Sequence, residues 1–259
     1  MNSYEALAGA YDVLTEDVQH RRRAEYLHRQ FRKSPIPVET VLDLGCGTGS
    51  IACLLARKGY AVTAVDASEE MLTVAAGKAA SLSVERPPFF LHQSMARLRL
   101  LQPVDAAVST LDAINYLTRP KDVQETFRRV FRYLKPGGRF LFDVNSPYKL
   151  RRMDGQVWLD ETEDVYCVWR TEFSRGVCTY WVDLFEQRED GSWERSCEEH
   201  RERAYEPEEL TQWLREAGFG KVTVTGDMTG KPPAAGEDRL IFLCEKPRQG
   251  NPKSLGESS

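Results

Sequence analysis

Residues 41–50, VLDLGCGTGS, carry an apolar run into a turn with three glycines in five positions. The run is typical of a buried strand, and residues 50–59 have the apolar spacing of a helix that stops at Gly59. Glycine in such a turn lets the backbone approach a ligand closely, and the N-terminus of the following helix points at that ligand. The stretch therefore predicts a strand–turn–helix unit with a ligand site at the turn.

Strand and helix patterns alternate through the first 146 residues. Apolar runs predict five strands, at 40–45, 60–66, 88–93, 105–110 and 139–146. Helices are expected up to about Lys33 and at 50–59, 68–80 and 121–134, with Ser68 as the N-cap of the third. Such alternation is typical of a parallel sheet covered on both faces, which binds ligands at the carboxyl ends of its strands.

The pattern changes after residue 150. Three strands are expected at 163–173, 176–187 and 193–205, and the turn residues between them favour consecutive antiparallel pairing. A helix at 207–218 follows, and then two strands at 221–228 and 239–246. The link between these last two strands is too short for a helical crossover, so they should pair antiparallel.

Composition excludes several classes of protein. The formal net charge of −4 gives no general reason to expect a nucleic-acid partner. The six cysteines form no C-x-x-C pair and have no zinc-ligand spacing, so we expect reduced thiols and no metal site. We also expect no signal peptide and no membrane span, which favours a cytoplasmic protein. The basic stretch HRRRAEYLHRQFRK at 20–33 is either a solvated helix face or a contact for RNA.

The spacing of the glycines narrows the choice of ligand. The dinucleotide fingerprint is G-x-G-x-x-G, but here the third glycine of Gly45, Gly47 and Gly49 comes one residue early, and Asp43 precedes the turn. This pattern resembles motif I of the class I S-adenosylmethionine-dependent methyltransferases. The resemblance implies a Rossmann-like α/β fold with a seven-stranded mixed sheet in the order 3-2-1-4-5-7-6. The antiparallel strands then form a three-stranded lid insertion.

The same resemblance divides the chain into four parts. Residues 1–150 would form the S-adenosylmethionine-binding core with an N-terminal helical lid, and 151–204 the antiparallel insertion. Residues 205–247 would complete the core domain, and 248–259 would be a disordered tail.

A second acid supports the choice of cofactor. Asp66 ends the second predicted strand, and its carboxylate would accept hydrogen bonds from both ribose hydroxyls of the cofactor; the alternative is an acid at the surface. The resemblance places Ala67 and Met71 against the adenine, although Met71 also suits a core position. Ser94 stands where the family often carries an acid that binds the adenine amino group, and Met95 beside it would cap the ring.

The remaining cofactor contacts implied by the resemblance surround the methionine part. Cys46 belongs to the glycine turn, and Thr110 and Leu111 end the fourth strand. Tyr11 lies in SYEALAGAYDVL, which resembles the start of the lid in the small-molecule branch of the family. It would cover the methionine carboxylate or the methyl group, or it is an aromatic residue of an amphipathic helix.

Candidate catalytic residues follow the fourth strand. The strand-four exit, VSTLDAINYL, resembles that of aminosugar N,N-dimethyltransferases, which carry a histidine at the position of Tyr116. Tyr116 would orient an amine or accept its proton through a neighbour, or it packs under the following helix. Asp112 would hold an ammonium group or cap the following turn. His200, in EEHRERAY, is either a further site residue or a surface histidine.

The expected reaction is methyl transfer from S-adenosylmethionine to a nitrogen or oxygen of a small molecule, giving S-adenosylhomocysteine. Three alternatives stay open: an RNA methyltransferase, a non-catalytic regulatory protein that binds S-adenosylmethionine, and an NAD-dependent oxidoreductase. The aromatic residues of the insertion suit either a roof over the substrate or the contact of a homodimer.

Overall fold

The computed structural model describes residues 19–161, 164–188 and 190–248. The predictions for Tyr11, for the rest of the N-terminal segment and for residues 249–259 of the tail lie outside the described residues.

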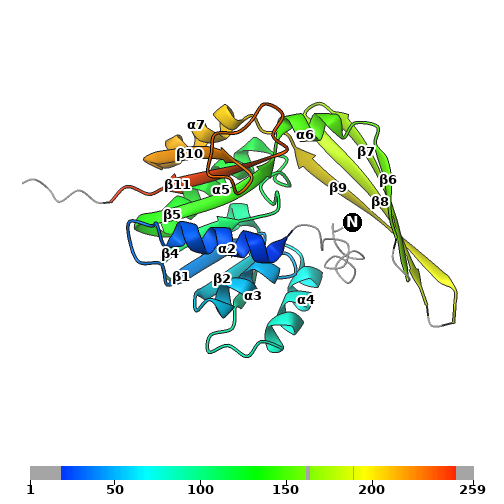
Figure 1. Cartoon of the computed structure of the whole chain (residues 1–259), viewed down its shortest axis with the longest axis horizontal. Helices are drawn as coiled ribbons and strands as arrows, with labels where there is room; N and C mark the ends of the chain where they lie inside the picture. Colours follow the sequence, from blue (N-terminus) through cyan, green and yellow to red (C-terminus); the bar gives the residue numbers. More distant parts are fainter. Residues whose placement is uncertain (1–18, 162–163, 189, 249–259) are drawn as a thin grey trace, which may run out of the picture.

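A seven-stranded sheet forms the core, in the order β10-β11-β5-β4-β1-β2-β3 (Figure 1). Its strands are β1 (Thr40–Leu44), β2 (Ala61–Asp66), β3 (Phe89–His92), β4 (Val104–Ser109), β5 (Leu134–Asn145), β10 (Lys221–Gly226) and β11 (Arg239–Glu245). Only β11 runs against its neighbours, pairing antiparallel with both β5 and β10. With β10 and β11 as the sixth and seventh strands of the core, the predicted order 3-2-1-4-5-7-6 is confirmed.

Helices cover both faces of this sheet. They are α2 (His20–Phe31), α3 (Ser50–Arg57), α4 (Glu69–Ala80), α5 (Pro120–Tyr133) and α7 (Pro207–Ala217), with a 3₁₀ turn η2 (Met95–Arg97). The short helix α6 (Pro147–Arg152) lies against the insertion instead. Alternate residues of β5 separate two cores: Phe140 and Phe142 pack with the side chains of α5 and α7, whereas Leu141 packs with those of α2 and α3. The predicted N-cap is present, since the Ser68 hydroxyl accepts a hydrogen bond from the Met71 N–H at 3.1 Å.

The insertion has four strands, so the prediction of three is wrong. They are β6 (Val157–Glu161), β7 (Val165–Ser174), β8 (Val177–Gln187) and β9 (Trp193–Arg203), each paired antiparallel with the next. The missed strand, β6, lies at an edge and pairs only with β7. Its apolar residues Val157 and Leu159 are 63% and 53% exposed, so no buried apolar run marks it in the sequence.

The insertion sheet stands beside the carboxyl ends of the parallel strands (Figure 1). At the end of β9, the Arg203 N–H donates a hydrogen bond to the Asn115 carbonyl at 2.8 Å, which ties the insertion to the loop after β4. Leu150 of α6 packs against Cys178 and Tyr180 of β8. No helix among the described residues is long and apolar enough to cross a membrane.

Candidate functional site

A cavity of about 320 Å³ opens at the carboxyl ends of β1, β2 and β4. Eleven of the predicted site residues line it: Gly45, Cys46, Gly47, Asp66, Ala67, Met71, Ser94, Met95, Thr110, Leu111 and Tyr116. Asp43, Gly49 and Asp112 are not part of its lining. The residues predicted as a cofactor site from four separate stretches of sequence therefore meet around one hollow.

The three glycines of the turn have different roles. All are left-handed, with φ of 65° at Gly45, 53° at Gly47 and 73° at Gly49. A Cβ atom at Gly45 would lie 2.6 Å from the Ala113 Cβ, and one at Gly49 would lie 2.9 Å from the Ala75 Cβ. A Cβ at Gly47 would meet nothing within 4 Å. Two glycines thus permit close packing, and Gly47 leaves open space at the cavity.

Two acids accompany the turn, and one of them, Asp66, holds it by hydrogen bonds. The Asp66 carboxylate accepts hydrogen bonds from the N–H groups of Gly47 at 2.8 Å and Ser68 at 2.9 Å, and burial raises its pKa. Asp43 is 1% exposed, and neither of its carboxylate oxygens has a hydrogen-bond partner among the described residues. Burial and the nearby charge of Asp66 raise the pKa of Asp43 to about 7. The site therefore holds buried negative charge that a cationic ligand would stabilise.

The loop after β4 is held by a third acid, the buried Asp143 of β5. Its carboxylate accepts hydrogen bonds from the N–H groups of Leu111 at 3.1 Å and Asp112 at 2.9 Å. Both of these loop residues have left-handed backbone, with φ of 58° and 55°. Such conformations are costly outside glycine and persist only where the surroundings hold them.

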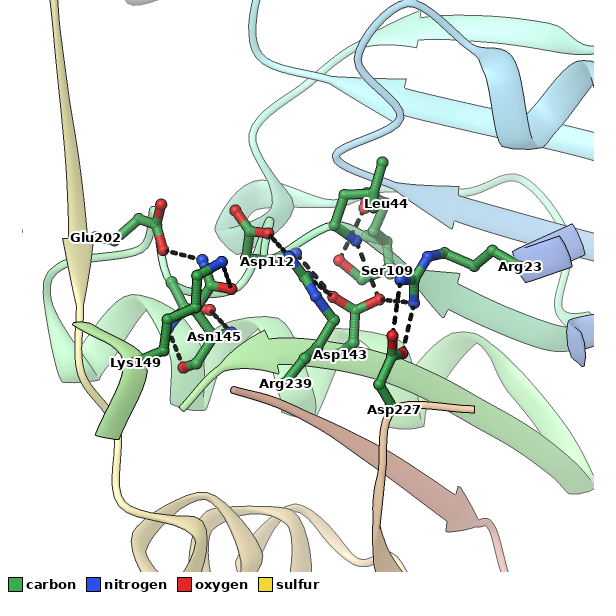
Figure 2. A network of polar contacts seen from close by, with 12 residues as sticks. Arg23, Leu44, Ser109, Asp112, Asp143, Asn145, Lys149, Glu202, Asp227 and Arg239 are labelled. Atoms are coloured by element: carbon green, nitrogen blue, oxygen red, sulfur yellow. Dashed lines mark hydrogen bonds and ion pairs between the residues drawn. The ribbon is translucent and has the colours of Figure 1, made fainter. Parts of the chain in front are cut away.

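Two arginines neutralise Asp143 (Figure 2). Arg23 of α2 lies 3.1 Å from it, and Arg239 of β11 forms a close ion pair with it. Burial opposes ionisation of Asp143, but these two guanidinium groups hold its pKa below the usual range. Arg239 also pairs with Asp112 at 2.6 Å. The carboxylate of Asp112 is thus fixed by an ion pair at the edge of the cavity.

Arg23 belongs to the basic stretch that motivated the RNA alternative. It is 4% exposed, because its guanidinium group turns inward to Asp143 and to Asp227 at 3.2 Å. This arginine is therefore part of the core of the protein and is unavailable to RNA.

His200 joins the site from the insertion. It is 2% exposed, so the interpretation as a surface histidine is wrong. Its Nε2 lies 2.9 Å from a carboxylate oxygen of Glu198, and its ring meets that of Tyr116 edge-on with 6.1 Å between centroids. The sequence of β9 did not indicate that His200 is buried, because charged residues occupy both faces of this strand.

Seven residues that line the cavity were not predicted: His20, Thr48, Ser50, Ile51, Ser68, Ala113 and Leu117. Thr48 and Ser50 flank Gly49, so the glycine turn itself was the signal for them. Nothing in the sequence links His20 to this site, because α2 reaches it only through the packing of the core.

The geometry fits S-adenosylmethionine. Gly47 leaves room for a ligand to lie against the backbone of the turn, and the buried carboxyl group of Asp43, although it does not line the cavity, adds negative potential that suits the positive charge of that cofactor. Asp66 lines the cavity with a carboxylate that can accept further hydrogen bonds.

Comparison with known proteins agrees with this geometry. Residues 41–138 match the family model described as a methyltransferase domain. A Bacillus subtilis (strain 168) protein named as a methyltransferase, YqeM, is 34% identical over 246 residues, which cover 94% of this chain and 97% of that protein. A protein from Geobacillus sp. (strain WCH70), also named as a methyltransferase, is 32% identical over 249 residues, which cover 94% of this chain and all of that protein.

Solved structures resemble the chain over nearly its whole length. An S-adenosylmethionine-dependent methyltransferase from Clostridium acetobutylicum superposes with a TM-score of 0.85 at 26% identity and covers 94% of this chain and 99% of its own. The sugar N-methyltransferase KedS8 from Streptoalloteichus has a TM-score of 0.76 at 20% identity, with 92% and 93% covered. The motif, the cavity and the full-length relatives agree, and the chain belongs to the class I S-adenosylmethionine-dependent methyltransferases.

Proposed function

We propose that the protein methylates a nitrogen or an oxygen of a small molecule. When bound, S-adenosylmethionine supplies a methyl group made electrophilic by its sulfonium. The protein's task is then to hold the acceptor in line with that methyl group and to exclude water, and orientation of this kind is worth about 7–11 kcal/mol.

The observation that carries the proposal is the contact between the cavity wall and the insertion sheet. Tyr116 lines the cavity, and its ring contacts buried His200 on β9. The end of β9 is hydrogen-bonded to Asn115, the residue before Tyr116. An acceptor that approaches the cavity from this side meets the insertion sheet close by, which favours a small molecule over a bulky polymer.

The names of relatives favour the same class of acceptor. A ubiquinone biosynthesis O-methyltransferase of Caulobacter vibrioides is 37% identical over 120 residues, 45% of each chain. The sugar N-methyltransferase KedS8 shares the fold. Methyltransferases of this architecture thus include proteins named for oxygen and for nitrogen acceptors.

Nine of the predicted residues take a role under this proposal. Asp66 would hold the ribose, and Thr110 and Leu111 the methionine part. The adenine would lie among Ala67, Met71, Ser94 and Met95. Asp112 and Tyr116 would face the acceptor, and the role of Tyr11 stays a prediction.

The test is transfer of labelled methyl from S-adenosylmethionine into a cell extract that is then separated by size. We expect the label in compounds below about the size of a short peptide, and none above background in RNA. The Gly47→Val variant, whose branched side chain would enter the cavity, should transfer none. Label that appears only in RNA would favour the RNA alternative instead.

A further inference from the structure

A second group of polar side chains adjoins the cavity on the side of the insertion. Glu202 of β9 extends toward Asn145 and Asp112 (Figure 2). The Asn145 side-chain amide donates a hydrogen bond to Glu202 Oε2 at 2.7 Å, and the Lys149 ammonium donates one to Asn145 Oδ1 at 2.9 Å. The side-chain amide of Asn145 is therefore fixed in orientation. It donates only to Oε2 of Glu202, so Oε1 remains available to another hydrogen-bond donor.

One carboxyl oxygen of Glu202 and one of Asp112 have no hydrogen-bond donor among the described residues. Glu202 is only 4% exposed, yet Oε1 has no hydrogen-bond donor among the residues that the structure describes. Asp112 uses Oδ1 for Arg239, and within the same described part of the chain Oδ2 has no donor either. Neither oxygen belongs to the fully enclosed unpaired atoms of the described residues, so both can be reached by a ligand that brings N–H groups to them.

The location links these oxygens to the place where the methyl group would be. Asp112 directly follows Leu111, which lines the cavity. Glu202 lies on the same face of β9 as His200, whose ring contacts Tyr116 of the cavity wall. The side chains of Glu202 and Asp112 are drawn on either side of Asn145 in Figure 2, and the charge of Asp112 raises the pKa of Glu202.

We propose that the methyl acceptor is an amine whose nitrogen binds between Glu202 and Asp112, with Glu202 Oε1 as the acceptor of the proton that this nitrogen must lose. The inference rests on the proposed function and narrows its substrate class from nitrogen or oxygen to nitrogen. An ammonium group carries several N–H donors and positive charge, which complements two open carboxyl oxygens better than the single donor of an alcohol does.

The proton and electrons balance as follows. An ammonium nitrogen has no lone pair, so one proton first passes from nitrogen to Glu202 Oε1. The freed lone pair forms the N–C bond to the methyl group while the C–S bond breaks and its electron pair stays on sulfur. The methylated nitrogen then carries the positive charge that the sulfonium had, and Glu202 returns its proton to solvent as product leaves.

The charges around Glu202 agree with this role. Burial, followed by the carboxylate of Asp112, raises the pKa of Glu202 to about 8, against the opposing effects of Asn145, Lys149 and Arg239. A base with a pKa near the working pH transfers protons efficiently. Tyr180 and Cys178 of β8 also face Glu202, and burial raises the pKa of both, so they stay neutral. His200 lies one register position further along the same face.

The first part of the test locates the methyl group. The small molecule labelled in the size-separated extract is fragmented by mass spectrometry, and we expect the methyl group on nitrogen. A methyl group on oxygen or carbon overturns this inference and leaves the proposed function standing. Label confined to macromolecules contradicts the proposed function itself.

The second part tests Glu202 without turnover. The identified amine is titrated into protein saturated with S-adenosylhomocysteine at pH 7, in buffers of different ionisation enthalpy. Because Glu202 is mostly protonated there, binding of an ammonium group should release about one proton in the wild type and none in Glu202→Gln. Equal proton release in both proteins would overturn the role of Glu202.

Turnover and a matched control complete the test. Glu202→Gln should bind S-adenosylhomocysteine as tightly as the wild type, which shows that it folds, and should lose about 10²–10⁴-fold in turnover. Glu172 is exposed and lies on the opposite face of the same sheet. Glu172→Gln should match the wild type in turnover and proton release, and an equal loss in both variants would contradict the proposal.

Discussion

At the scale of single residues, glycines of one motif meet different physical demands. Gly45 is confined by Ala113, whereas Gly47 faces open space, although both have positive φ. The sequence identified the motif, but only the structure separates a glycine needed for packing from one that leaves room for a ligand. We therefore expect the same substitution to have different effects at Gly45 and at Gly47.

Gly47→Ala should cost about 1 kcal/mol in unfolding free energy, because alanine resists positive φ. Its methyl group would enter the cavity, so the affinity for S-adenosylhomocysteine should fall at least about tenfold, a loss of about 1.4 kcal/mol. Gly45→Ala should cost about 2–4 kcal/mol, because its methyl group also overlaps Ala113. Chemical denaturation and calorimetry measure both. If Gly47→Ala binds as tightly as the wild type, the ligand does not lie against this turn.

The raised pKa of Asp43 predicts how the free energy of unfolding depends on pH. Burial, with Asp66 nearby, raises its pKa from 3.8 to about 7, so folding disfavours the ionised form. The penalty is absent below pH 4 and grows as the pH rises toward 7, to about 4 kcal/mol at about 1.4 kcal/mol per unit of pKa. Asp43→Asn removes the charge, so its stability relative to the wild type should improve over this range. The free energies of unfolding of both proteins are measured at pH 4 and pH 8 without cofactor. An equal difference between the two proteins at both pH values would contradict the prediction.

Sequence reasoning at this scale found residues whose role is local. The place of Asp66 at the end of a strand and the role of Ser68 as an N-cap were predicted, because a strand end and a helix start each have a recognisable signature. Glu202 was missed, since its importance depends on Asn145 and Asp112, which are distant in the sequence. Arg23 was expected either on a solvated face or in an RNA contact, and its inward ion pairs were missed for the same reason, because nothing near it in the sequence indicates Asp143.

At the scale of elements, Asp143 joins α2, the loop after β4, β5 and β11. Asp143→Asn would leave the buried Arg23 and Arg239 with less compensating charge and weaken the support of the left-handed loop. Removing one partner of a buried pair costs about 3–5 kcal/mol, so we expect a loss of that size in unfolding free energy at pH 7.

The control for Asp143→Asn is Glu206→Gln. Glu206 pairs with Arg151 where both side chains are more than half exposed, and such pairs contribute about 0–1 kcal/mol. The difference between Asp143→Asn and the wild type should shrink in acid, because the lowered pKa of Asp143 means that its contribution is present above about pH 4 and is lost below it. Similar losses in the two variants at pH 7 would contradict the central role of Asp143.

Elements with a buried apolar face were predictable, and exposed or short ones were not. The strands of the core and helices α3, α4, α5 and α7 follow their periodicity closely. The exposed edge strand β6 lacks that pattern. The short helix α6 went unpredicted, although Ser146 caps it and Pro147 opens it, because six residues are too few to show helical periodicity.

At the scale of the whole molecule, the fold brings two separate sheets to one site. The core supplies the cavity at the carboxyl ends of β1, β2 and β4, and the insertion supplies His200 and Glu202 beside it. The family's core was predictable from motif I and the alternation of elements. The contact between the sheets was not, because it depends on where β9 returns to Asn115.

The most direct test of the account is a crystal structure of the protein with S-adenosylhomocysteine. We expect the homocysteine part against Gly47, the ribose on Asp66 and the adenine beside Met71 and Ser94. The sulfur should point toward Tyr116 and the space between Asp112 and Glu202. A ligand bound outside this cavity, or with its sulfur turned away from β9, would contradict the account.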